Sequence, residues 1–103
     1  MKIVKDIGKD IDGNQYISIV YKNSDDKLHR TNGPAIIYLK NNQIIYKEYW
    51  QHDELHRLNG PAIIKKVNCS VGYYIKGEGL TKDEFLKKTI PYRRIKKLRK
   101  VLK

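Results

Sequence analysis

The sequence has few of the residues that cross-link a small protein or restrict its backbone. Its 103 residues include one cysteine, three prolines and one tryptophan. Cys69 has no second cysteine to pair with, which excludes an intramolecular disulfide and favours a reducing compartment. No apolar run approaches the roughly 18 residues of a membrane span, and the N-terminus lacks the apolar stretch of a secretory signal. We therefore expect an intracellular, cytoplasmic protein without a transmembrane segment.

Acidic residues are absent from the C-terminal segment 87–103. This segment holds nine of the 22 Lys and Arg residues, whereas the other 13 basic residues are balanced by 11 acidic ones. The net charge of +11 therefore resides mainly in the C-terminal segment. A one-sided charge of this kind indicates an anionic partner rather than a particular fold.

A ten-residue phrase occurs twice in the sequence. Residues 28–37 read LHRTNGPAII and residues 55–64 read LHRLNGPAII, so the copies differ at one position and lie 27 residues apart. A period of about 20 to 50 residues is typical of repeat proteins, in which each unit stacks on its neighbour to bury an apolar face. The repetition predicts a scaffold, since catalytic sites are seldom duplicated in this way.

Runs of β-branched and aromatic residues alternate with turn signals around both copies. They predict an N-terminal hairpin in residues 1–21 and one further hairpin per repeat, with Asn41-Asn42 as a turn that tolerates positive φ. We expect a mostly β fold (β+α), an antiparallel meander of repeated β-hairpins with one or two C-terminal helices. The strands expected after the first hairpin lie at 35–39, 44–50, 62–67 and 71–75.

Helix signals follow the repeats. Thr81 and Glu84 form a capping box, which satisfies the first unpaired N–H groups of a helix. A second helix is expected from Thr89, with Pro91 in its first turn, where a missing N–H is tolerated. The sequence thus predicts a β-hairpin repeat domain with a capping helix at 1–88 and a basic amphipathic helix at 89–103.

Each copy of the phrase reads Leu-His-Arg-x-x-Gly-Pro-Ala, and the aromatic pairs Tyr49-Trp50 and Tyr73-Tyr74 and a helix-forming ending at 80–85 accompany it. Over about residues 21–88, this pattern resembles a MORN-like repeat variant of bacteriophage and large DNA virus proteins. The resemblance implies a single twisted sheet of β-hairpins without known catalytic residues, and contacts with proteins or membranes. It also implies a viral or phage protein. Only two full units are present, Asp53 replaces an expected turn glycine, and the basic segment lies outside the family, so the function is not carried over.

Eight residues of the phrase are expected to be structural. We expect its histidines and arginines to hydrogen-bond backbone carbonyls where the chain leaves the sheet. The spacing of strands would separate the two histidines by about 9 to 10 Å, too far for them to share a zinc ion. The eight residues are His29, Arg30, Gly33, Pro34, His56, Arg57, Gly60 and Pro61.

The sequence shows no constellation typical of an enzyme. The acidic pairs Asp25-Asp26 and Asp53-Glu54 recur in turn-type segments, where Asp favours local backbone hydrogen bonds over acid–base chemistry. No nucleophile with a base, phosphate loop or metal-ligand cluster is recognised in the sequence. We therefore predict a non-enzymatic protein with no catalytic residue, no metal site and no cofactor.

Two sets of residues are candidates for partner contacts. In a single-layer sheet some aromatic residues should stay exposed, available to a protein or to nucleic-acid bases, although ordinary core and cross-strand packing uses the same residues. These candidates are Tyr38, Tyr46, Tyr49, Trp50, Tyr73 and Tyr74. The expected polyanion contacts are Arg93, Arg94, Lys96, Lys97, Arg99 and Lys100.

The basic helix and the sheet favour two different functions. The first is a small, non-catalytic, basic module that binds nucleic acid or another polyanion through the C-terminal helix, with little base specificity. The second is a protein–protein interaction module, a virion component or an inhibitor of a host factor, that uses an exposed sheet face or edge. An acidic protein surface is an alternative ligand for the helix.

Overall fold

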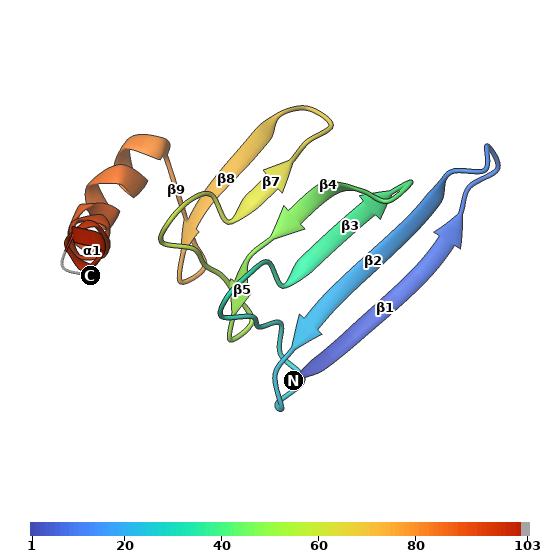
Figure 1. Ribbon diagram of the computed structural model, residues 1–103, viewed down its shortest axis with the longest axis horizontal. Coiled ribbons are helices and arrows are strands. Elements are labelled where there is room, and N and C mark those ends of the chain that lie inside the picture. Colours follow the sequence, from blue (N-terminus) through green and yellow to red (C-terminus); the bar gives the residue numbers. More distant parts are fainter. Residues whose placement is uncertain (102–103) are drawn as a thin grey trace.

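The computed structural model describes the backbone of residues 1–101 and the side chains of residues 1–92. Seven strands of this part form one antiparallel sheet in the order β1-β2-β3-β4-β7-β8-β9, while β5 and β6 pair separately (Figure 1). One helix, α1, follows the last strand. A mostly β meander of hairpins with a C-terminal helix is thus confirmed. The elements are β1 (Lys2–Lys9), β2 (Gln15–Lys22), β3 (Ile36–Lys40), β4 (Gln43–Glu48), β5 (Trp50–Gln51), β6 (Glu54–Leu55), β7 (Ile63–Lys65), β8 (Ser70–Ile75), β9 (Glu78–Leu80) and α1 (Lys82–Val101).

Tight turns with two positive-φ residues join β3 to β4 and β5 to β6. Asn41 and Asn42, with φ of 49° and 67°, connect β3 to β4, as the sequence predicts. The turn between β5 and β6 has φ of 50° at His52 and 66° at Asp53. Two consecutive positive-φ residues produce a turn whose twist matches that of the flanking strands. Asp53 therefore adopts the conformation for which the repeat pattern expects glycine.

The two faces of the sheet carry different chemistry. Ser18, Tyr38 and Tyr46 lie opposite one another on neighbouring strands, and Tyr16 is two residues before Ser18 on β2. Because side chains alternate along a strand, these residues share one side of the sheet, which we call the aromatic face. The other side, the aliphatic face, carries the cross-strand series Ile7, Ile17 and Leu39.

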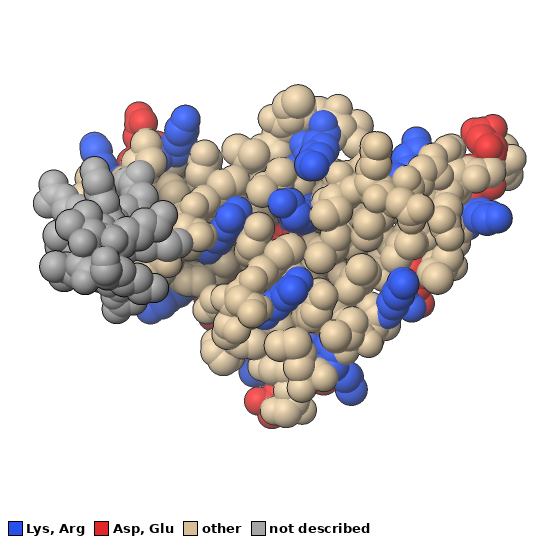
Figure 2. All heavy atoms as spheres, viewed as in Figure 1, with Lys and Arg blue, Asp and Glu red and all other residues tan. Residues whose placement is uncertain are grey.

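Very little of the described chain is buried. The buried hydrophobic residues are Ala35, Ala62 and Phe85. The edge strand β1 is exposed along its whole length, with Ile3 60% and Ile7 62% exposed. Basic side chains are spread over the drawn face of the molecule rather than gathered in one block (Figure 2). A single-layer sheet with so small a core depends on specific contacts between its repeats for much of its order.

The helix begins at the predicted capping box and closes the end of the sheet. The Thr81 N–H donates to Glu84 Oε1 at 2.9 Å, and the Glu84 N–H donates to Thr81 Oγ1 at 3.2 Å. The buried Phe85 ring packs against Tyr73 of β8, with ring centroids 4.7 Å apart. A helix that starts here is therefore fixed to the last hairpin by an aromatic contact.

The expected second helix from Thr89 is wrong, because α1 continues through this position to Val101. Pro91 lies inside the helix and cannot donate to the carbonyl of Lys87. The Thr89 hydroxyl is buried and donates to the carbonyl of Phe85 at 2.8 Å. Pro91 therefore removes one backbone hydrogen bond from α1 but does not end the helix. In the part of the chain that the structure describes, no helix is both long and apolar enough to cross a membrane.

Replacement of Phe85 by Ala should remove most of the packing between α1 and the sheet. Truncation of a buried phenylalanine costs about 3 to 5 kcal/mol, a large fraction of the stability of a small domain. Thermal denaturation followed by circular dichroism should show a strongly lowered Tm for Phe85→Ala and a smaller loss for Phe85→Leu. A Phe85→Ala protein that melts like the wild type would contradict the contact with Tyr73.

Candidate functional site

Each copy of the phrase forms an arginine clamp. The guanidinium carbon of Arg30 lies 4.0 Å from the ring centroid of Tyr21, and Nη1 donates to the carbonyl of Pro34 at 3.2 Å. In the second copy, Arg57 lies 3.9 Å from the ring centroid of Tyr49 and donates to the carbonyl of Pro61 at 3.1 Å. The expectation that the arginines bond backbone carbonyls is confirmed.

The glycine of each phrase makes room for the guanidinium. A Cβ added at Gly33 would lie 2.9 Å from Arg30 Cζ, and one at Gly60 would lie 3.0 Å from Arg57 Cζ. Both distances are tighter than ordinary Cβ contacts, so a side chain at either position would force the guanidinium to shift against its tyrosine. The Tyr-Arg-Gly stack therefore explains why arginine and glycine are spaced three residues apart in both copies.

The histidines fix the following turn rather than a carbonyl. The backbone N–H of His52 donates to His29 Nδ1 at 3.0 Å, and the N–H of Lys76 donates to His56 Nδ1 at 2.9 Å. The expectation that both histidines donate to carbonyls is therefore wrong. Both turn residues have positive φ, and their N–H groups point toward the preceding repeat, where a neutral imidazole accepts them.

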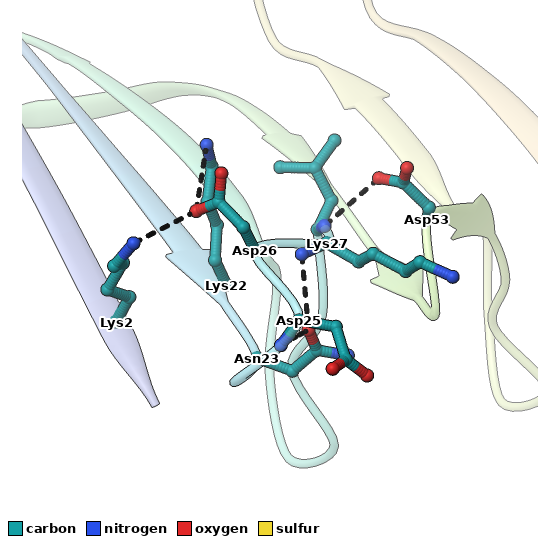
Figure 3. Close-up of polar contacts among 8 residues, drawn as sticks. Lys2, Lys22, Asn23, Asp25, Asp26, Lys27 and Asp53 are labelled. Atoms are coloured by element: carbon teal, nitrogen blue, oxygen red, sulfur yellow. Dashed lines mark hydrogen bonds and ion pairs between the residues drawn. The ribbon is translucent and has the colours of Figure 1, made fainter.

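Acidic and amide side chains order the turn before the first phrase (Figure 3). Asn23 Oδ1 accepts the backbone N–H groups of Asp25 and Lys27. Asp26, which has a φ of 63°, forms an ion pair with Lys2 at 3.2 Å. Asp53 Oδ1 accepts the N–H of Leu28 at 3.0 Å and so joins the two repeats. The predicted location of Asp26 and Asp53 in turns is confirmed, but the local backbone bonds are made by Asn23, whereas Asp26 pairs with lysine and Asp53 bonds a residue of the other repeat.

A pocket of about 330 Å³ opens between the two phrases, and we call it the arginine pocket. Its walls include the loops 31–33 and 58–59, the side chains of Arg30 and Arg57, and Tyr92 of α1. Among the described residues, the lining includes Arg30 and Arg57 and no carboxylate. Because Tyr92 belongs to the basic helix, the helix and the two arginine clamps meet at this pocket.

The six aromatic candidates divide into two groups. Tyr49 lies against Arg57 and also lines the arginine pocket, and Tyr73 packs against Phe85. The other four are not part of an arginine clamp. Tyr38 and Tyr46 stack on the aromatic face, the Trp50 indole N–H donates to Glu48 at 3.1 Å, and the Tyr74 ring lies against Gly72 and Gly79.

The sequence patterns did not predict two residues that contribute to these surfaces. Tyr16 joins Tyr38 on the aromatic face, which strand alternation and the register of β2 with β3 would have shown. Tyr92 reaches the arginine pocket only because α1 continues past residue 89, and no sequence signal indicated this.

The predicted polyanion contacts fall in the second half of α1. Their backbone is helical, but their side chains lie outside the described residues. These residues are Arg93, Arg94, Lys96, Lys97, Arg99 and Lys100.

Comparison of the chain with protein-family models, with curated proteins and with solved structures finds no match. The resemblance to MORN-like repeats therefore remains a prediction. What the chain can bind must be inferred from its own geometry.

The stability of the repeat junction should depend on the protonation of His56. Partial burial, followed by the charge of Lys76, lowers the pKa of His56 below its ordinary value of 6.5, although Glu54 opposes this shift. The unfolded chain then binds the proton more tightly than the folded one. The contribution of neutral His56 to the stability of the folded protein is therefore complete above about pH 6.5 and is lost as the pH falls below that value.

Thermal denaturation at about pH 7.5 and about pH 5.5 checks this expectation, because aspartates and glutamates remain largely ionised over this range. The wild type should lose more Tm between the two conditions than His56→Gln, which should be less stable at the higher pH. An equal pH dependence in both proteins would show that another group is responsible.

Proposed function

We propose that this protein is a non-catalytic module that binds nucleic acid or another polyanion where α1 meets the arginine pocket. The observation that carries the proposal is the lining of the pocket, in which the described residues include Arg30, Arg57 and Tyr92 and no carboxylate. The helix positions after Tyr92 hold six basic residues before Val101. The arginine clamps and the helix that carries this basic sequence thus meet at the pocket through Tyr92, and their combined charge favours an extended anionic ligand.

The clamped arginines retain hydrogen-bonding capacity for such a ligand. A guanidinium has five N–H donors, whereas Arg30 uses one in a bond to Pro34 and Arg57 uses two, to Asn59 and Pro61. Each guanidinium is already held against a tyrosine ring. Such preorganised groups lose less side-chain entropy when they bind phosphate in a bidentate manner.

The repeated phrase supports a wider assignment. The resemblance rests on the six fixed positions of Leu-His-Arg-x-x-Gly-Pro-Ala. The residues at these positions all lie at the junction between hairpins. We infer on this basis a MORN-like repeat protein of viral or phage origin that acts in the cytoplasm of its host.

A second candidate function is supported by β1. This strand lies at the edge of the sheet, and its apolar residues Ile3 and Ile7 are largely exposed. An exposed edge strand can accept an additional strand from a partner protein, whether a virion component or a host factor. Such binding would depend only weakly on salt, which separates it from polyanion binding.

Replacement of Arg93, Arg94, Lys96 and Lys97 by Gln should weaken binding to polyanions of every sequence. On duplex DNA, each neutralised phosphate contributes about 0.9 to the slope of log affinity against log salt, so this slope should fall by up to about four units. Fluorescence anisotropy with a labelled duplex and with heparin, at several salt concentrations, measures the effect.

The matched control replaces four exposed lysines elsewhere, Lys5, Lys9, Lys27 and Lys66, and removes the same charge. It should lower the slope much less than the helix variant. Equal effects of the two variants would mean that net charge, and not the helix, drives binding. A wild type without salt-dependent binding would overturn the proposed function.

Substitution of Thr31 by Glu places a carboxylate in the wall of the arginine pocket without altering either clamp. We expect a loss of affinity of about tenfold or more for heparin and for duplex DNA, because the new carboxylate repels the anionic groups of the ligand in the pocket. The control is Gln43→Glu, which adds the same charge at the far end of the β3–β4 hairpin. Similar affinities of the two variants would exclude the pocket from the binding surface.

A further inference from the structure

The aromatic face presents tyrosine rings that the arginine clamps do not use. Tyr16 and Tyr38 are 38% and 42% exposed. Tyr38 stacks on Tyr46 of the neighbouring strand, with centroids 5.2 Å apart and planes inclined by 21°. Stacked rings on a sheet surface form a platform on which a further flat ring can lie.

The surroundings of these rings leave them accessible. The residue opposite Tyr38 on β2 is Ser18, which is too small to cover a ring. The hydroxyl of Tyr16 donates to Asp10 at 3.2 Å, and that of Tyr46 donates to Glu48. Asp10 and Glu48 therefore bind the hydroxyl ends of the tyrosines and not the ring faces, and a further carboxylate, Asp6, lies opposite Ser18 on this face.

Lysines flank the rings on the same face. Lys40 Nζ lies 5.9 Å from the ring centroid of Tyr16, and Lys65 Nζ lies 6.0 Å from that of Tyr46. Lys40 is opposite Tyr16 in the register of β2 and β3, and Lys65 is opposite Tyr46. Aromatic platforms interleaved with cations suit a ligand that has flat rings joined by negative charges.

We propose that the aromatic face binds unpaired bases of single-stranded nucleic acid. Bases stack on Tyr16 and Tyr38, and Lys40 and Lys65 contact the phosphates between them. Every base has a π-face, so stacking tolerates any sequence, whereas the bases of a duplex are already stacked. The inference names the class of polyanion and in that respect rests on the proposed function. It uses a different surface, because Tyr21, which carries Arg30, lies on the aliphatic face.

The test compares three labelled probes: oligothymidylate, a duplex of the same length, and heparin, which has no bases. The double variant Tyr16→Leu/Tyr38→Leu keeps apolar side chains but removes the rings. It should bind oligothymidylate about 5- to 150-fold more weakly for each stacked base lost, while its affinity for heparin stays unchanged. The control Tyr16→Phe/Tyr38→Phe keeps the rings and should bind all three probes like the wild type. Circular dichroism and Tm verify that both variants fold.

The two proposals fail in different ways. Oligothymidylate binding that the Leu substitutions leave unchanged, together with salt-dependent heparin binding, would overturn the stacking inference and leave the proposed function in place. Wild-type binding to oligothymidylate that Phe preserves and Leu removes, without binding to heparin or duplex, would overturn the helix as the binding element and support the aromatic face. Equal loss of heparin and oligothymidylate in a folded Leu variant would also overturn stacking, since heparin has no base to stack.

Discussion

The arginine clamp is the interaction on which the rest of this structure depends. The part of the chain whose burial is described has three buried hydrophobic residues, so a core contributes little there and the long connections before β3 and β7 need another means of attachment. Stacking of Arg30 on Tyr21, against the backbone of Gly33, fixes the first connection to the strand before it. The histidine beside the arginine then binds the next turn. Each phrase thus secures its own loop and the following hairpin together.

The end of the array shows what replaces the clamp. Tyr21, Tyr49 and Tyr73 occupy corresponding places in successive units, and among the described side chains arginine covers the first two. Phe85 covers the third, so the last tyrosine is buried by the capping helix rather than by another loop. This exchange sets where α1 begins and brings Tyr92 to the arginine pocket. The contact between Tyr73 and Phe85, which ends the repeats, therefore also fixes the start of the helix that contains the most basic segment of the chain.

The sequence predicted the architecture better than the contacts. The 27-residue period, the Asn41-Asn42 turn and the Thr81 capping box are local signals, and each corresponds to an element of the structure. Whether His29 donates or accepts depends on the direction of a turn N–H in the next repeat, which no local pattern encodes. The continuation of α1 past Pro91 is equally non-local, since it is supported by a helix already anchored through Phe85.

Strand alternation places the tyrosines that join the repeats and the tyrosines of the proposed binding surface on opposite faces of this sheet. The covered tyrosines Tyr21, Tyr49 and Tyr73 hold the repeats together, whereas Tyr16 and Tyr38 project from the opposite face. A single-layer sheet has no second layer to bury that face, so an exposed ring there contributes less to folding than a covered one. Because no clamp requires Tyr16 or Tyr38, replacing their rings tests ligand binding without removing the contacts that hold the fold. Substitutions on the aromatic face can therefore change the proposed binding surface while the contacts between the repeats stay intact.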